Sequence, residues 1–338
     1  MPRVPKVTVI IPNYNHALHL PKRIESVLQQ TLRDLDVLIL DDCSTDNSRD
    51  IIEQYALQDS RIRTIFNNQN SGSTFKQWNL GFEHARGEYL WIAESDDYAD
   101  VHFLETLVGR LEADPSIGLA YCGSWNVDDG GHVTDDHKDF YYELDGKLWK
   151  SDFVAEGNRL VQRFMSYRCI IPNASAVVFR HRLAQRLGKA NEQMRLSGDW
   201  LYWAKMLSLS RVAFVAEQLN YFRQHGNNVR SRSALSGLSL VEETIVLREM
   251  QQYGPPDAIF YHKKIESILS NWFYAMIYFQ VPMRNHLAIF RNLTKVETRF
   301  PQRFAAKFGY FLFSNKLSGI RQFIGDKWLY PVIRKVAR

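Results

Sequence analysis

The acidic tetrapeptide Glu94-Ser95-Asp96-Asp97 places two carboxylates side by side at the end of an apolar run, Tyr89-Leu90-Trp91-Ile92-Ala93. This run indicates a buried strand that begins after Gly87. Adjacent anions repel each other, so such a pair usually needs a cation or a hydrogen-bonded ligand. A simpler role also fits, because Asp97 precedes a predicted helix over 101–111 and aspartate is a good N-cap residue. The tetrapeptide alone therefore predicts either a metal site or a helix cap.

Three more strands are predicted upstream, and the first two of them also end in polar residues. Val7 to Ile11 is a β-branched run that stops at Pro12-Asn13-Tyr14-Asn15. A second run over 36–40 ends at Asp41-Asp42, and a third covers 62–66.

Apolar residues at helical spacing fill the intervals between these strands. One helix opens at Pro21, a second follows a cap at Ser44 or Thr45, and a third covers 74–84. Strands that alternate with helices imply a doubly wound α/β fold with a largely parallel sheet. The carboxyl ends of parallel strands emerge at one edge, so the three polar loops are expected to converge on one ligand.

The composition is that of a soluble globular protein. The chain has 338 residues, enough for one large domain or two modest ones, with 45% hydrophobic and 23% charged residues. Its three cysteines lie far apart and fit neither a zinc motif nor a disulfide framework, so we expect reduced thiols in a cytosolic protein. Neither a G-x-G-x-x-G fingerprint nor a P-loop motif is present.

Three segments, taken together, resemble the family 2 glycosyltransferases of the GT-A fold. They are Val9-Ile10-Ile11-Pro12-Asn13-Tyr14-Asn15, Leu40-Asp41-Asp42-Cys43-Ser44-Thr45-Asp46 and Glu94-Ser95-Asp96-Asp97. The stretch from Gly81 to Asp97 is similar to the approach to that family's DXD motif. The resemblance covers about the first two thirds of the chain. It implies a Rossmann-like mixed sheet in a catalytic domain over 1–228, with a helical, basic region over 229–338.

Family 2 glycosyltransferases take a sugar from a nucleotide-sugar donor. The resemblance implies that the loops after the first two strands hold the nucleobase of this donor. The residues concerned are Pro12, Asn13, Tyr14 and Asp42. A carboxylate at Asp42 can accept the N3–H of uracil or thymine, and Tyr14 can pack on the ring face. Each has a plainer alternative, because Tyr14 also fits an aromatic side chain that covers the core and Asp42 also fits a turn residue.

The family's DXD motif implies a divalent cation, Mn²⁺ or Mg²⁺, that neutralises the donor's diphosphate. We expect Asp97 to be its ligand and Asp96 to lie nearer the ribose. A segment that resembles a family loop over the diphosphate adds His225 as a metal or phosphate contact and Arg223 as an ion-pair partner. The same segment also fits a solvated basic loop. Lys76 is a weaker candidate for a phosphate contact.

Besides binding the donor's nucleobase and neutralising its diphosphate, glycosyl transfer needs a general base that accepts a proton. Asp199 stands before the apolar run Trp200-Leu201-Tyr202-Trp203, where family members carry a catalytic aspartate. The resemblance implies that it deprotonates the acceptor hydroxyl, and the flanking Trp200 and Trp203 favour a raised pKa. A single base with direct attack implies inversion at the anomeric carbon. Asp199 also fits a helix cap.

Two departures from the family pattern affect the prediction. Cys43 stands where the family often has glycine, so the turn after Asp42 must accommodate a side chain. The Q-x-x-R-W signature of processive synthases is absent, which favours transfer of a single sugar.

The last third of the chain is predicted to be helical and basic. From Arg284 onward twelve Lys and Arg residues stand against only Glu297 and Asp326. From Pro301 onward aromatic residues alternate with cations, as in an interfacial helix that lies on an anionic membrane. Docking of these aromatics on the catalytic domain is the alternative. No run is long enough to span a bilayer, so the expected location is cytoplasmic, with peripheral attachment at the inner face of the cytoplasmic membrane as the alternative.

The sequence thus predicts an inverting, metal-dependent glycosyltransferase with a UDP- or dTDP-sugar donor. A saccharide or lipid-linked acceptor is expected, in cell-surface polysaccharide or glycolipid assembly, with acceptor choice in the loops over 123–171. A nucleotidyltransferase is a rival, but the loop after the first strand lacks its Gly/Arg/Lys-rich phosphate loop. The other rival is a degenerate nucleotide-sugar sensor or scaffold. No motif for nucleic-acid binding is found.

Overall fold

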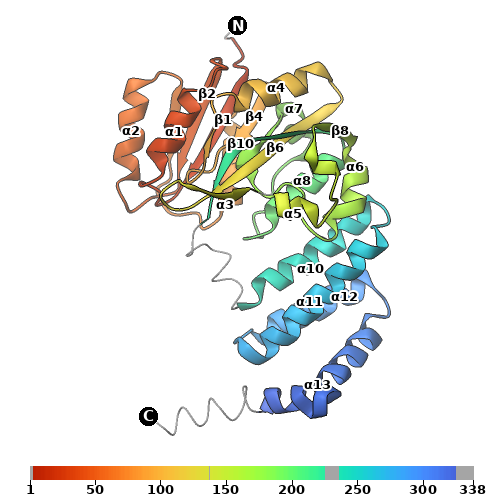
Figure 1. The fold of residues 1–338 in the computed structure, drawn as a ribbon. Helices are drawn as coiled ribbons and strands as arrows, with labels where there is room; N and C mark the ends of the chain where they lie inside the picture. Colours follow the sequence, from red (N-terminus) through yellow and green to blue (C-terminus); the bar gives the residue numbers. More distant parts are fainter. Residues whose placement is uncertain (1–2, 137, 225–235, 325–338) are drawn as a thin grey trace. The chain divides into compact units, whose positions relative to one another are not determined.

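The computed structural model describes residues 3–136, 138–224 and 236–324, and the chain divides into two compact units. The first unit, Met1–His225, is built on a ten-stranded sheet (Figure 1). The second unit, Gly226–Arg338, is helical in its described part. His225, predicted to contact the metal or a phosphate, lies outside the described residues.

The strands of the first unit share one sheet in the order β3-β2-β1-β4-β9-β6-β10-β5, with β7 beside β6 and β8 beside β10. Their bounds are β1 (Val7–Asn13), β2 (Leu35–Asp41), β3 (Ile62–Phe66), β4 (Tyr89–Ile92), β5 (Tyr98–Ala99), β6 (Ile117–Val127), β7 (Val133–Asp136), β8 (Phe153–Glu156), β9 (Val177–Arg180) and β10 (Arg211–Arg223). Strands β1 to β4 are mutually parallel, whereas β9 runs antiparallel between β4 and β6. The predicted α/β class and mixed sheet are confirmed.

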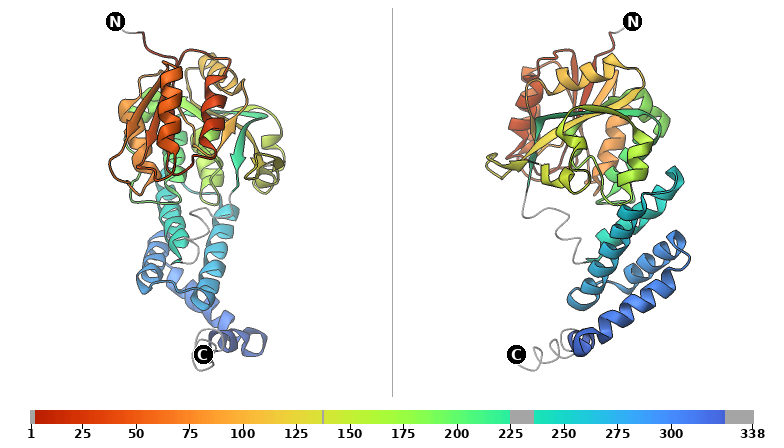
Figure 2. Two further views of the ribbon diagram at one scale, coloured as in Figure 1. Left: turned by 90° about the vertical axis from the view of Figure 1, so that its left-hand side faces the viewer. Right: turned by 45° about the vertical axis from the view of Figure 1, so that its right-hand side comes forward.

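Helices cover both faces of this sheet (Figure 2). Their bounds are α1 (Leu20–Leu28), α2 (Ser48–Gln58), α3 (Thr74–His84), α4 (Phe103–Ala113), α5 (Lys138–Tyr142), α6 (Gly157–Leu160), α7 (His181–Leu187) and α8 (Gly198–Ser208). Short helical turns lie at η1 (Leu148–Lys150), η2 (Val161–Met165) and η3 (Ala174–Ala176).

Alternation of side chains along each strand decides which helix packs on which face. Val9 of β1 belongs to the core that contains α1 and α4, whereas the next residue, Ile10, packs against Leu80 and Phe82 of α3. Helix α8 lies on the α3 face, because Phe82 stacks on Tyr202 with ring centroids 5.5 Å apart. Helices α3 and α8 are therefore neighbours on one side of the sheet.

The structure corrects two predicted helix caps. The N-cap of α2 is Asn47, three residues after the earlier of the two expected positions, and Ser44 instead donates to Asp41 through its hydroxyl, 2.5 Å away. The N-cap of α4 is His102, so Asp97 does not cap this helix. The cap interpretation of Asp97 is therefore wrong, and its carboxylate has other partners.

The second unit consists of α10 (Leu238–Met250), η4 (Gln251–Tyr253), α11 (Ala258–Tyr278), α12 (Met283–Val296) and α13 (Phe300–Ile324). Three aromatic residues of α13 were predicted to face a membrane, but Phe304, Phe308 and Phe311 pack against Phe273 of α11. This aromatic face of α13 is therefore occupied by protein. Within the described part of the chain, no helix has the length and apolar character needed to cross a bilayer.

Replacing Gly87 by alanine should destabilise the first unit strongly. A Cβ at this position would overlap the backbone nitrogen of Thr8 and lie 2.7 Å from the carbonyl carbon of Val7, and neither atom can move without displacing β1. We expect a loss of more than about 2 kcal/mol in the free energy of unfolding, measured by urea titration. Gly109→Ala is the control, because Gly109 lies in α4 with open space around it and should gain up to about 1 kcal/mol. Equal effects of the two substitutions would contradict the close approach at Gly87.

Candidate functional site

The carboxyl ends of β1, β2 and β4 meet at one edge of the sheet, as their parallel pairing requires. Asn13, the last residue of β1, donates through Nδ2 to Asp41 Oδ1 at 3.0 Å and to Ser44 Oγ at 3.2 Å. Asn13, Asp41 and the neighbouring Pro12 are all buried. The Asn13 side chain therefore holds the two loops together, and the predicted donor contacts of Pro12 and Asn13 stay predictions.

The turn after Asp42 has a backbone conformation that glycine adopts most readily. Cys43 has a φ of 62°, in the left-handed region, so the expected turn that accommodates a side chain is confirmed. In the adjacent loop Asn15 has a φ of 56°, and its Oδ1 accepts from the backbone N–H of Thr45 at 2.7 Å. The two loops are thus fixed to each other, and each contains a residue in a backbone conformation that residues other than glycine rarely adopt.

The carboxylate of Asp42 lies just beneath the surface, 4% exposed, and orders the loop before α3. Its Oδ1 accepts from Asn67 Nδ2 at 2.7 Å, the Ser71 N–H at 2.9 Å and Gln77 Nε2 at 2.9 Å. Its Oδ2 accepts from the Ser71 hydroxyl at 2.8 Å. Oδ2 accepts one donor whereas Oδ1 accepts three, so Oδ2 is the oxygen that can accept a further donor.

Burial alternates along the acidic tetrapeptide. Ser95 and Asp97 are 2% exposed, whereas Glu94 and Asp96 reach the surface in part. Glu94 Oε1 accepts from the indole nitrogen of Trp78 at 2.9 Å. The partly exposed carboxylates of this loop are therefore those of Glu94 and Asp96, two residues apart.

Asp97 was predicted to be the metal ligand, and the structure places it inside the protein instead. Its Oδ1 accepts from the backbone N–H of Arg223 at 2.9 Å. Its Oδ2 accepts from Asn173 Nδ2 at 3.0 Å and from the Ser175 hydroxyl at 2.7 Å. These hydrogen bonds anchor the loop to β10 and η3. Asp96 is the more exposed of the two aspartates, and the metal role of Asp97 stays a prediction.

A fully buried arginine of α1 lies beneath the acidic loop. Arg23 is 0% exposed, its Nε donates to the Glu94 carbonyl oxygen at 2.8 Å, and its Nη2 donates to the Ser175 hydroxyl at 3.1 Å. Nη2 also lies 3.9 Å from Asp97 Oδ2. The guanidinium thus supplies a positive charge to a loop that carries three carboxylates.

Arg223 was predicted to pair with the donor, but it binds the protein's own backbone. Its Nε donates to the Asp96 carbonyl oxygen at 2.8 Å, and its Nη1 donates to those of Asp128 and Asp129 at 2.6 and 2.7 Å. The residue is 4% exposed. Arg223 therefore joins the loop after β6 to the acidic loop, and its expected contact with the donor stays a prediction.

Charges in the acidic loop shift one another's pKa values. Burial, and then the charge of Asp96, raise the pKa of Glu94 to about 8. The same two causes raise the pKa of Asp97 to about 6, although attraction to Arg23 opposes them. Burial lowers the pKa of Arg23 to about 10, against the attraction of the carboxylates. Near neutral pH, burial and the neighbouring carboxylates therefore favour the protonated form of Glu94, because its pKa is raised to about 8, whereas Arg23 stays charged.

Asp199 lies in the first turn of α8 and is partly exposed. Its Oδ1 accepts from the backbone N–H of Trp200 at 2.7 Å, one of the amides that a helix start leaves without an internal partner. The turn abuts α3, because a Cβ on Gly198 would come within 2.6 Å of the Phe75 ring. Phe75 in turn packs edge-on against Trp78, with ring centroids 5.2 Å apart. This chain of contacts connects Asp199 to the indole that binds Glu94.

The two remaining candidates lie at the surface. Tyr14 is 43% exposed at the end of β1, in a position where it can meet a ligand. Lys76 is exposed on α3, and its Nζ donates to the Ser71 carbonyl oxygen at 3.2 Å. The donor role of each stays a prediction.

Comparison with known proteins identifies the family. The profile described as glycosyl transferase family 2 matches residues 8–170. Glycosyltransferase GlyG of Streptococcus pneumoniae is 26% identical over 235 residues, 66% of this chain and 72% of GlyG. An uncharacterized glycosyltransferase of Nostoc sp. is 30% identical over 241 residues, 68% of this chain and 69% of that protein. This chain belongs to glycosyl transferase family 2.

The solved structures agree on the fold of this glycosyltransferase. The crystal structure of S. aureus TarS in complex with UDP-GlcNAc is similar with a TM-score of 0.58 and 17% identity, over 95% of this chain and 79% of that chain. The predicted GT-A fold is therefore confirmed.

Sequence reasoning missed three residues that shape the site of this glycosyltransferase, namely Arg23, Trp78 and Ser175. One of them left a signal: Arg23 interrupts the apolar stripe of α1, three residues after Leu20 and four before Val27. A charged side chain in a buried stripe indicates a buried partner. Trp78 and Ser175 left no signal, because their partners come from distant parts of the chain.

Removing the Arg23 guanidinium should cost far more stability than removing an exposed one. Arg23→Met leaves the Asp97 carboxylate buried without its cation, and we expect a loss of about 3–5 kcal/mol in the free energy of unfolding. The exposed Arg33→Met is the control and should change it by no more than about 0.5 kcal/mol. Adding Asp97→Asn to Arg23→Met should recover part of the loss in urea titration. Equal effects of Arg23→Met and Arg33→Met would show that the Arg23 guanidinium does not stabilise the buried Asp97 carboxylate.

Proposed function

We propose that this glycosyltransferase is metal-dependent and inverting, and that it moves one sugar from a UDP- or dTDP-activated donor to a saccharide or lipid-linked hydroxyl in polysaccharide or glycolipid assembly. The observation that carries this proposal is the line of contacts from Glu94 through Trp78 and Phe75 to Gly198. It brings the acidic loop and the helix start with Asp199 to the same side of the sheet. Glycosyl transfer needs both, one to receive the diphosphate and one to accept a proton.

The choice of a pyrimidine donor rests on Asp42 and Tyr14. Three side chains and a backbone amide hold the Asp42 carboxylate in one orientation, and Oδ2 keeps a free acceptor position for the N3–H of uracil or thymine. Tyr14 offers an exposed aromatic face near the same edge of the sheet. TarS, which shares the fold, was solved with UDP-GlcNAc.

A divalent cation fits the acidic loop. Glu94 and Asp96 are partly exposed. Burial, and then the charge of Asp96, raise the pKa of Glu94, so a nearby cation would favour its ionised form. In the described ranges no three His, Cys, Asp or Glu side chains group to hold an ion, so donor phosphates would complete the shell of Mn²⁺ or Mg²⁺. We assign Asp96 as the protein ligand, with Glu94 beside it. The bound cation would neutralise charge on the departing diphosphate.

Asp199 is assigned as the general base. The acceptor oxygen attacks the anomeric carbon, the bond from that carbon to the phosphate oxygen breaks, and the hydroxyl proton passes to the Asp199 carboxylate. The leaving nucleoside diphosphate takes the bonding electron pair. One displacement from the side opposite the leaving group inverts the anomeric centre.

Asp199→Asn should reduce kcat by about 10²- to 10⁴-fold and leave donor affinity nearly unchanged, because an amide cannot accept the proton. Transfer is followed as release of UDP from a UDP-sugar, and donor affinity by calorimetry. Asp50→Asn is the matched control, since Asp50 also lies in the first turn of a helix and is exposed. Turnover that survives in Asp199→Asn would remove this residue from the mechanism.

Calorimetric titration with UDP, dTDP, GDP and CDP, each with and without Mn²⁺, tests the donor site. We expect Mn²⁺-dependent binding of UDP or dTDP, weakened about tenfold or more by Asp96→Asn. Asp100→Asn, a partly exposed carboxylate four residues along, should leave binding unchanged. Preference for GDP would overturn the role of Asp42. If the folded protein binds none of the four, the scaffold interpretation replaces the enzyme.

A further inference from the structure

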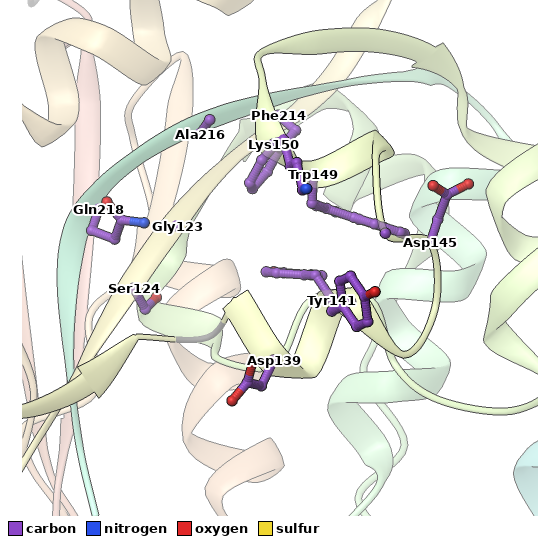
Figure 3. A pocket seen from close by; sticks show the side chains of 12 residues that line it. Gly123, Ser124, Asp139, Tyr141, Asp145, Trp149, Lys150, Phe214, Ala216 and Gln218 are labelled. Atoms are coloured by element: carbon purple, nitrogen blue, oxygen red, sulfur yellow. The ribbon is translucent and has the colours of Figure 1, made fainter.

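A cavity of 390 Å³ opens in the first unit beside β6 and β10, away from the residues assigned above (Figure 3). It lies on the face of the sheet that α3 and α8 cover, because Phe214 lines it while Ala213 and Val215, on either side, belong to the opposite core. The pairing of β10 with β6 is irregular here. Val215 pairs with Cys122 and Asn220 pairs with Ser124, so β10 advances by five residues where β6 advances by two. Such a bulge bends the strand and leaves space beside it.

The wall of this cavity is aromatic and rigidly held. The ring of Trp149 stacks on Tyr141 with centroids 4.9 Å apart and planes 14° apart, and Phe214 packs against Tyr141 at 5.8 Å. The indole nitrogen of Trp149 donates to the Tyr121 hydroxyl at 2.7 Å. Because these polar atoms satisfy each other, the wall offers a ligand mainly apolar ring surface.

Polar side chains surround the aromatic wall. Figure 3 shows Ser124 and Gln218 on the strands, Asp139 on α5 and Lys150 on the opposite side of the opening. Ser124 Oγ accepts from Asn220 Nδ2 at 3.0 Å, which leaves its own hydroxyl proton free to donate. Within the described part of the chain, the side chains of Asp139, Lys150 and Gln218 have no protein partner.

We propose that this cavity binds a sugar ring of the acceptor, an inference that rests on the proposed glycosyl transfer. A pyranose has apolar C–H faces and a rim of hydroxyl groups, which matches an aromatic wall ringed by a carboxylate, an ammonium group, an amide and a hydroxyl. An alkyl chain would bury these polar groups without hydrogen bonds, at a cost in free energy. A phosphate is disfavoured, because the Asp139 carboxylate lies at the same opening, whereas that of Asp145 is paired with Arg163 at 2.8 Å.

The cavity is joined to the turn that carries the assigned base. Trp149 packs against Phe164 of η2 with centroids 5.1 Å apart. The next residue of η2, Met165, accepts at its carbonyl oxygen from the indole nitrogen of Trp200 at 3.0 Å. Trp200 adjoins Asp199, so the aromatic wall and the base are held by directly contacting elements.

Saturation-transfer NMR on the full chain tests the site with methyl glycosides of glucose, galactose, N-acetylglucosamine, N-acetylgalactosamine and rhamnose. We expect at least one glycoside to receive saturation on its ring protons. Ala216→Leu, which fills the cavity, and Gln218→Ala, which removes a rim amide, should each weaken that binding about tenfold. Glu217→Ala and Lys147→Ala are controls outside the lining and should leave it unchanged.

Calorimetry with UDP on the same samples separates this inference from the proposed function. If UDP binds but no glycoside does, or if the two cavity variants bind glycosides as the wild type does, the cavity is not the acceptor site and the transferase proposal stands. If octyl glucoside receives saturation only on its alkyl chain, the occupant is apolar and the sugar assignment is wrong. If a glycoside binds but UDP does not, the donor site is wrong and the sugar cavity remains supported.

Discussion

The acidic loop after β4 depends on the ion pair between two buried groups, Arg23 and Asp97. Three carboxylates in four residues repel one another, and burial adds the cost of removing charge from water. Arg23 offsets both effects, because its guanidinium attracts the carboxylates and also hydrogen-bonds the Glu94 carbonyl oxygen. Hydrogen bonds to the protein hold it at Nε and Nη2, so these two contacts do not depend on a ligand. The outward-facing Glu94 and Asp96 can therefore be in place before a donor arrives, and the cost of ordering them is met in folding.

The same loop determines where the assigned base lies. Glu94 accepts from Trp78, and the Phe75 ring on the preceding turn of α3 packs against the start of α8 at Gly198. Only glycine permits this contact, because any Cβ at position 198 would meet the ring. Aromatic packing, rather than a polar contact, thus sets the spacing between the acidic loop and Asp199. Packed aromatic rings have few alternative arrangements, which suits two groups that must act on one bond.

Much of the sheet could be predicted from local sequence, because β-branched runs and helical spacing are local signals. The strand over 62–66 and the helix over 74–84 have the predicted bounds. The direction of β9 could not be predicted, because it depends on pairing with β4 and β6 from distant parts of the chain. The orientation of the side chains within the tetrapeptide could not be predicted for a related reason: whether Asp96 or Asp97 faces outward depends on Asn173 and Ser175, about eighty residues later.

Strand β10 connects the two sites of the proposed reaction. Near its end the Arg223 amide holds Asp97, and the Arg223 side chain ties the loop after β6 to the acidic loop. Nearer its start, Phe214 lines the aromatic cavity just before the bulge and Gln218 lines it within the bulge. A strand paired in strict register would leave no space there, because β6 would pack against it without a break. The bulge therefore lets one rigid strand hold a charged loop for the donor and an apolar cavity for the acceptor, with no flexible segment between them.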